Sequence, residues 1–143
     1  MTRPKYFTLE ELLTSSTARK YSIENLPSFE IVGRLCELGL FLDGIREAWG
    51  SGVRVSSGFR NRALNAKVGG VPDSVHQIGY AADLQPVNGK FEEFKKFILN
   101  FLKDKMYDEV IIERNTKTGA QWIHLQLYSN QGYQRRKSFS MAV

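Results

Sequence analysis

The sequence predicts a small α+β domain in which helices pack against a central antiparallel sheet. Apolar residues recur at helical intervals over residues 31–49 and again over residues 90–103. Residues 110–112 and 123–127 instead alternate between apolar and other types, and turn-forming residues at 115–119 join them into a predicted hairpin. Helices and short strands follow one another without the repeated strand–helix alternation that is typical of a parallel sheet.

A cap and a stop signal mark the first two predicted helices. Thr8 followed by Glu11 has the spacing of a capping box, in which side chains satisfy free backbone N–H groups at the start of a helix. The long apolar repeat ends at Gly50-Ser51-Gly52, a typical helix stop. The residues expected to face inward from the short first helix are Leu9, Leu12 and Leu13.

The middle of the chain indicates shorter elements. Residues 53–57 predict a strand, residues 61–68 a helical turn or two, and residues 69–72 an irregular connection. The helix predicted over residues 90–103 carries an apolar, largely aromatic stripe, which is typical of a side that faces a core. This stripe consists of Phe91, Phe94, Phe97, Ile98 and Phe101.

Length and composition bound the possible classes of protein. The chain has 143 residues, of which 42% are hydrophobic; this suffices for one core and is too short for two ordinary domains. We therefore expect a single domain over residues 1–143. No apolar run approaches the roughly 18 positions that a membrane span needs, so a transmembrane helix is excluded. No apolar segment of the secretory type follows the basic residues at the N-terminus, and we expect synthesis in the cytoplasm without a signal peptide.

Charge narrows the possible partners, and the cysteine content excludes internal disulfides. The formal net charge of +5 favours an anionic partner, and both nucleic acid and the bacterial cell wall meet this description. Arg135, Arg136 and Lys137 form the one tight basic run, which we interpret as a solvated tail in preference to a nucleic-acid-binding arm. Cys36 is the only cysteine, so intramolecular disulfides are excluded, and we interpret it as a small core residue.

The only two histidines, His76 and His124, are the first candidates for chemistry. His124 lies between two apolar strand residues that we expect to face the core, so its side chain projects from the opposite face of the sheet. Taken alone, a strand histidine is more often structural than a metal ligand. Asp83 follows His76 by seven residues, about 10 Å along a helix and more along a strand, so neither regular element lets both bind one ion. Gly79 between them permits a chain reversal.

With such a reversal, a loop ligand and a strand ligand converge. We expect a strand over residues 80–85, with Asp83 and Ala81 on one face. Two neutral imidazoles and one carboxylate fill three positions of a tetrahedral zinc ion and leave the fourth for a water molecule. A structural zinc site normally has four protein ligands, so this donor set indicates a catalytic Zn²⁺ site.

A zinc peptidase also needs a base and a cation beside the metal. Glu113 belongs to the same predicted sheet face as His124, within one or two residue pairs of it, although a solvated carboxylate is an equal interpretation. Arg60 follows a strand end and a glycine turn, and its planar guanidinium suits a substrate carboxylate or a polarised carbonyl; the alternative is a surface ion pair. Ser74 suits a hydrogen bond to a peptide terminus or, equally, a cap on the following turn.

Four ordered segments resemble the D-alanyl-D-alanine carboxypeptidase-like family of zinc peptidases, peptidase family M15. They are Ser57-Gly58-Phe59-Arg60, Leu64-Asn65, the S-V-H-Q-I-G-Y-A-A-D-L segment at residues 74–84, and Trp122-Ile123-His124. The resemblance covers about half of the chain, with the motif-bearing core at about residues 53–127. It implies His76, Asp83 and His124 as zinc ligands, Arg60 in substrate or transition-state binding, and Ser74 in substrate binding. It also implies the α+β fold shared with the hedgehog signalling domain.

The sequence departs from the family pattern at one position. Many members place the catalytic glutamate or aspartate three residues before the last histidine, where this chain has Gln121. An amide cannot accept the proton of a water molecule. Compact phage-type members resemble this chain in carrying a glutamate at the end of the preceding strand, so the resemblance assigns the base to Glu113.

These observations lead to one main hypothesis and two alternatives. We expect a zinc-dependent hydrolase of phage or prophage type that cuts a D-amino-acid-containing amide bond in peptidoglycan or a muropeptide, as a carboxypeptidase or an endolysin-type endopeptidase, and that acts on the cell wall after release. The first alternative is a zinc-containing cell-wall-binding module that is catalytically impaired. The second is a basic nucleic-acid-binding domain with structural histidines, which no recognisable DNA-reading motif supports.

Overall fold

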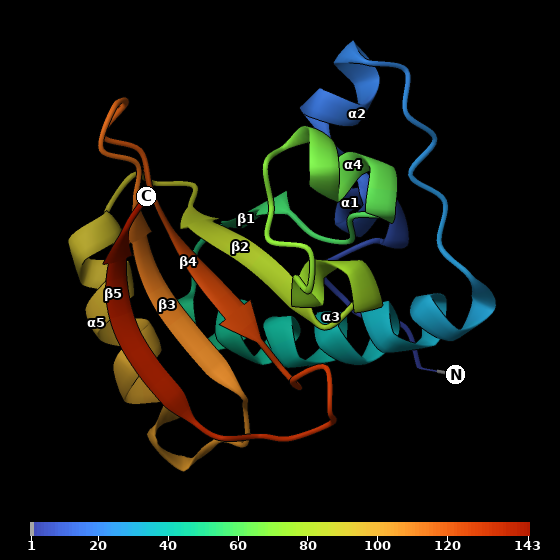
Figure 1. Ribbon diagram of the computed structural model, residues 1–143. Coiled ribbons are helices and arrows are strands. Elements are labelled where there is room, and N and C mark those ends of the chain that lie inside the picture. Colours follow the sequence, from blue (N-terminus) through green and yellow to red (C-terminus); the bar gives the residue numbers. More distant parts are fainter. Residues whose placement is uncertain (1) are drawn as a thin grey trace.

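The computed structural model describes residues 2–143 and contains a five-stranded sheet with the strand order β1-β2-β4-β3-β5 (Figure 1). The strands are β1 (Val53–Ser57), β2 (Ala81–Pro86), β3 (Glu109–Arg114), β4 (Gln121–Gln126) and β5 (Lys137–Ala142). Helices cover one face of this sheet, and the predicted α+β class is confirmed. The sheet is not purely antiparallel, however, because β5 runs parallel to β3 while the other pairs are antiparallel.

Strand β5 corrects the interpretation of residues 135–137 as a solvated tail. The backbone N–H groups of Arg136 and Lys137 donate to the carbonyls of Tyr107 and Asp108, at 3.1 and 2.9 Å. The Arg135 side chain pairs with the Asp108 carboxylate, which is fully buried. The basic run therefore leads into an edge strand, and Arg135 has a charged partner that is distant in sequence.

The helices agree closely with the predicted ones, with two short additions. The long helix α3 (Phe29–Trp49) ends where Gly50 adopts a left-handed conformation, with φ of 76°. Helix α1 (Leu9–Leu13) begins where Thr8 Oγ1 accepts the Glu11 N–H. The remaining helices are α2 (Ser16–Lys20), α4 (Arg62–Lys67), α5 (Phe91–Phe101) and the 3-10 turns η1 (Val75–Ile78) and η2 (Leu102–Asp104). The sequence did not predict α2 or η1.

Helices α3 and α5 bury one face of the sheet and leave the opposite face for the site (Figure 1). Their contribution to the core includes Leu35, Leu38, Leu42, Ile45, Phe94 and Ile98. Two predictions about individual residues were wrong. Leu9 is 42% exposed, and in the five-residue helix α1 only Leu12 is buried. Cys36 is only partly buried. No helix in residues 2–143 is long and apolar enough to cross a membrane.

The N-terminal region clamps the segment that follows β1. The Asn25 side-chain amide donates to the carbonyls of Leu13 and Phe59 and accepts the N–H of Asn61. The Phe59 N–H in turn donates to the carbonyl of Leu12 at 2.8 Å. Gly58 lies in this clamp, where an added Cβ atom would collide with the Leu12 carbonyl. Residues with no chemistry of their own thereby fix the backbone at residues 58–61.

Replacing Gly58 with alanine tests this clamp. We expect Gly58→Ala to lower the free energy of unfolding by about 1–3 kcal/mol, because the new methyl group overpacks a site bounded by backbone atoms. Gly33→Ala is the matched control: Gly33 is inside α3 with no atom within 4 Å of the added Cβ. This control should raise stability by about 0.5–1 kcal/mol. Urea denaturation measures both, and equal stability of Gly58→Ala and wild type would contradict the clamp.

Candidate metal centre

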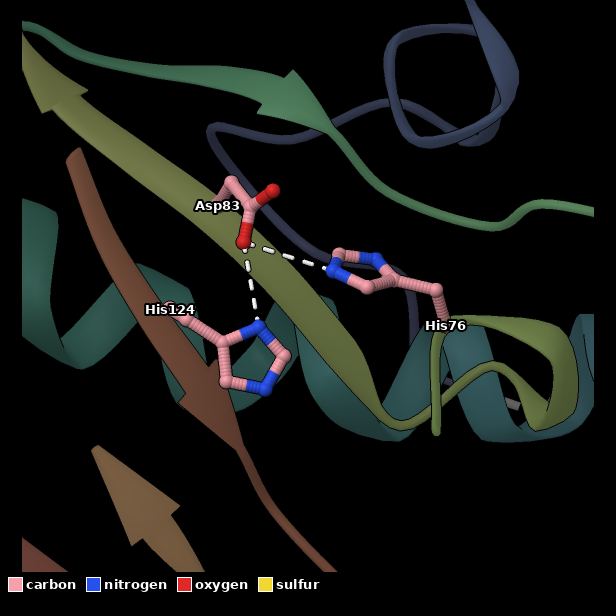
Figure 2. A group of neighbouring side chains, drawn as sticks. All are labelled: His76, Asp83 and His124. Atoms are coloured by element: carbon pink, nitrogen blue, oxygen red, sulfur yellow. Dashed lines mark hydrogen bonds and ion pairs between the residues drawn. The ribbon is translucent and has the colours of Figure 1, made fainter. Parts of the chain in front are cut away.

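His76, Asp83 and His124 converge from three separate elements on the sheet face opposite α3 and α5 (Figure 2). Asp83 on β2 lies directly opposite His124 on β4, and η1 presents His76 from the side. Asp83 Oδ1 lies 3.3 Å from His76 Nε2 and 3.1 Å from His124 Nδ1. One ligand atom from each residue lies within 4.8 Å of the others.

Three local contacts hold His76 in place. Ser74 Oγ accepts the backbone N–H of His76, and Gly79 reverses the chain toward β2 with φ of 89°. The Gly58 carbonyl lies 2.7 Å from His76 Nδ1. A carbonyl only accepts hydrogen bonds, so Nδ1 carries the proton and Nε2 presents its lone pair. Nε2 is buried and has no hydrogen-bond partner in the described part of the chain, although it faces Asp83.

His124 is held in the same way as His76, but the roles of its two ring nitrogens are exchanged. Its Nε2 lies 2.7 Å from the side-chain oxygen of Gln126, two residues along the same strand. The proton on Nε2 is donated to that oxygen, so in the neutral ring Nδ1 is the atom with the free lone pair. Nδ1 is also the atom that faces Asp83. Both imidazoles thus direct an unprotonated nitrogen at one carboxylate oxygen.

Electrostatics leave the three groups in different protonation states. Burial alone raises the pKa of Asp83, but the charges and hydrogen bonds of the histidines in their protonated forms outweigh it and hold this pKa well below its usual range. Burial lowers the pKa of His76, with Asp83 opposing in part. Burial also lowers the pKa of His124, but the hydrogen bond and charge of Asp83 outweigh it and leave this pKa raised. At neutral pH, Asp83 is therefore ionised and His76 is neutral, the forms that bind a cation.

The three residues fit a zinc ion. Zinc bound tetrahedrally at about 2.0–2.1 Å places neighbouring ligand atoms about 3.3 Å apart. The two distances from Asp83 Oδ1, 3.3 and 3.1 Å, agree with this spacing. Electron-rich atoms so close together in a buried site repel one another unless a bound cation, or a proton on an imidazole, lies between them. No further histidine, cysteine or carboxylate joins the group within residues 2–143, so a tetrahedral ion held there would have one position left for a water molecule.

Glu113 and Arg60 lie beside this group. Glu113 pairs with Trp122 across β3 and β4, and Ile111 pairs with His124, so Glu113 is a diagonal neighbour of His124 on the same face. Burial and the negative charge of Asp83 raise the pKa of Glu113, while the positive charges of His124 and Arg60 act against this rise.

Arg60 approaches from the segment that follows β1. Its backbone N–H donates to the carbonyl of His76 at 3.1 Å, and its side-chain Nε is buried with no hydrogen-bond partner among the described residues. Burial lowers the pKa of Arg60, and the charges of Asp83 and Glu113 raise it in part. The guanidinium stays protonated at neutral pH, because its ordinary pKa is above 12.

The comparison with protein families agrees with this geometry. The family model of peptidase M15 matches residues 5–126, most of the chain. This chain belongs to the peptidase M15 family. No curated protein matches it significantly. Peptidase M15 is a family of zinc peptidases, and the matched region contains the whole His-Asp-His group.

The position at which this M15 chain departs from the family pattern faces away from the candidate metal centre. β4 is regular over Gln121–Gln126, so the odd separation of Gln121 and His124 puts their side chains on opposite faces. The Gln121 carbonyl accepts a hydrogen bond from the Gln85 side chain. A carboxylate at residue 121 would therefore not reach the metal ligands in this strand.

The remaining site residues divide into one that was predicted and three that were missed. Ser74 is buried and caps η1, the structural alternative considered for it; contact with substrate stays a prediction. The missed residues are those that orient the histidines: Gly58, Gln126 and Asp108. Gln126 had a sequence signal, because it is two residues from His124 on the same strand face. The Gly58 carbonyl had none, since a backbone acceptor has no side-chain signature.

We expect the M15 chain to bind one zinc ion with an affinity that falls as the pH is lowered. His124 must lose a proton to bind, and its raised pKa places this loss above the ordinary value of about 6.5. Below that pKa, lowering the pH by one unit should weaken zinc binding about tenfold for each proton that zinc displaces. Competition with a chromophoric chelator between about pH 5.5 and 8.5 measures the effect.

Two carboxylate variants control this measurement. Asp83→Asn removes the central ligand and should abolish stoichiometric zinc, whereas Asp73→Asn changes an exposed carboxylate nearby in sequence and should retain it. An affinity that is independent of pH, or equal in wild type and Asp83→Asn, would exclude this ligand set.

Proposed function

We propose that this chain is a zinc-dependent peptidase that hydrolyses a D-amino-acid-containing amide bond of bacterial peptidoglycan. The observation that carries the proposal is a group of two histidines and an aspartate close enough to share one metal ion, next to a glutamate and an arginine. This group occurs in a chain of the peptidase M15 family. The net charge of +5 suits an anionic cell-wall substrate. The proposal includes action on the cell wall after release, as in enzymes of phage or prophage type.

His76, Asp83 and His124 would hold the zinc ion through Nε2, a carboxylate oxygen and Nδ1. When bound, the ion would supply Lewis-acid chemistry, polarising the scissile carbonyl and lowering the pKa of a water molecule. Glu113 accepts the proton of the attacking water at its carboxylate and passes it to the leaving amine. The pKa of Glu113 is raised, which brings it closer to the pKa of a group that both accepts and returns a proton near neutral pH.

Arg60 stabilises the negative charge that develops on the carbonyl oxygen, or binds a substrate carboxylate. Its buried Nε has no hydrogen-bond partner within residues 2–143, which supports this role because an unsatisfied buried donor is available to a ligand. Ser74 accepts the His76 N–H through its oxygen, so its hydroxyl proton is free to donate to a peptide terminus.

Glu113→Gln is the direct test of this mechanism. We expect the variant to bind zinc as wild type does and to lose about 10²–10⁴-fold in kcat on muropeptides, because an amide cannot accept the proton. Product analysis by mass spectrometry on D-Ala-D-Ala peptides and on cross-linked muropeptides distinguishes the carboxypeptidase from the endopeptidase.

Gln121 offers the matched control. Adding Gln121→Glu to Glu113→Gln should restore no activity, since residue 121 is on the opposite face of β4. Recovery of activity in the double variant would assign the base to residue 121 instead. Wild type that binds zinc and purified sacculi but cuts nothing would favour the cell-wall-binding module, and salt-sensitive DNA binding without stoichiometric zinc would favour the nucleic-acid-binding domain.

A further inference from the structure

A buried carboxylate lies behind the metal centre and has no part in the proposed mechanism. Asp108 precedes β3, is fully buried, and accepts hydrogen bonds from Arg135 Nε and Nη2, both at 2.8 Å. It also accepts the Arg135 backbone N–H at 3.1 Å. Its own backbone binds the Gln126 carbonyl and the Lys137 N–H. Asp108 thus joins the ends of β3, β4 and β5.

The Asp108 carboxylate fixes the orientation of the Gln126 amide. Gln126 Nε2 lies 2.9 Å from Asp108 Oδ2. An ionised carboxylate can only accept, so the amide nitrogen must point toward Asp108. The amide oxygen consequently points the other way, where it lies 2.7 Å from Nε2 of His124.

The Gln126 amide in turn fixes the protonation of the His124 ring. Its oxygen can only accept a hydrogen bond, which requires a proton on Nε2 of His124. With the proton there, Nδ1 keeps a lone pair directed at the group formed with His76 and Asp83. The ion pair of Arg135 and Asp108 therefore determines which nitrogen of His124 is free, through one intervening amide.

We propose that Gln126, oriented by Asp108 and Arg135, is a positioning residue that keeps the proton on His124 Nε2 and leaves Nδ1 free to bind the metal. This inference rests on the proposed zinc site but not on catalysis. Hydrogen-bond partners of metal-binding histidines typically change metal affinity about 10–100-fold. The Gly58 carbonyl has the corresponding role for His76, but as a backbone atom it cannot be replaced by mutation.

Zinc affinity of the purified full-length chain tests the proposal, measured by chelator competition. Gln126→Met keeps the length of the side chain and removes the acceptor, and should weaken zinc binding about 10–100-fold. Asp108→Asn should weaken it similarly. The Arg135 backbone N–H and Nε both donate to Oδ1, so the asparagine oxygen stays there and its NH2 group faces Gln126. The Gln126 amide then turns around and presents a donor to His124 Nε2. The double variant Asp108→Asn with Gln126→Glu exchanges the amide and the carboxylate, restores an acceptor for Nε2–H, and should recover affinity.

Glu109→Gln is the matched control. Glu109 also lies near Arg135, at 3.5 Å, but is no member of the hydrogen-bond chain to His124. Neutralising it should leave zinc affinity within about twofold of wild type. In the zinc-loaded protein, NMR should show a slowly exchanging His124 Nε2 proton in wild type and in Glu109→Gln, and a fast-exchanging one in Gln126→Met.

The possible failures are distinguishable. Wild-type zinc affinity in a folded Gln126→Met protein, or failure of the double variant to recover any affinity while it remains folded by circular dichroism, would overturn the positioning role. Zinc binding without peptidoglycan hydrolysis would overturn the proposed peptidase function and leave the positioning role intact. Wild type without zinc binding would overturn both.

Discussion

The structure of the site depends on one electrostatic constraint: Asp83 Oδ1 lies against one nitrogen of each of two imidazole rings. The other nitrogen of each ring is hydrogen-bonded to an acceptor. Three electron-rich atoms in a buried position are stable only with positive charge between them. Two neutral imidazoles with one carboxylate form the donor set of catalytic zinc sites, which keep a position open. The family and the geometry therefore lead to the same class of chemistry by independent routes.

The fold meets this constraint with two kinds of support. The β2–β4 pairing sets Asp83 opposite His124 with the accuracy of a hydrogen-bonded ladder. His76 comes from a 3-10 turn, which has no ladder, and its position depends on Ser74, Gly79 and the Gly58 carbonyl. Gly58 is itself held by contacts between Phe59 and the end of α1. The end of α1 thereby supports the backbone that positions His76.

The parts of the fold that were predictable are those with local signals. Apolar periodicity gave α3 and α5, and strand alternation placed Glu113 and His124 on one face, as the pairing confirms. The family motifs gave the three residues of the candidate metal group, which the structure brings together.

The parts that were missed depend on contacts that are distant in sequence. Strand β5 pairs with β3, and Arg135 binds Asp108, which lies 27 residues earlier. Neither partner is evident from the local sequence, so the basic run was interpreted as a solvated tail. The five-residue helix α1 is too short for its apolar pattern to predict burial, and Leu9 is exposed as a result. The contacts that orient both histidines were not predicted. The Gly58 carbonyl has no side-chain signature, and the position of Gln126 on the strand face of His124 was a signal that was not used.

Anomalous diffraction at the zinc absorption edge from crystals of the zinc-loaded protein tests the central claim most directly. The account predicts one strong peak bound by His76 Nε2, an Asp83 carboxylate oxygen and His124 Nδ1, with a water molecule as the fourth ligand. A zinc-loaded crystal with no peak among these three side chains, or with a fourth protein ligand closing the open position, would contradict it.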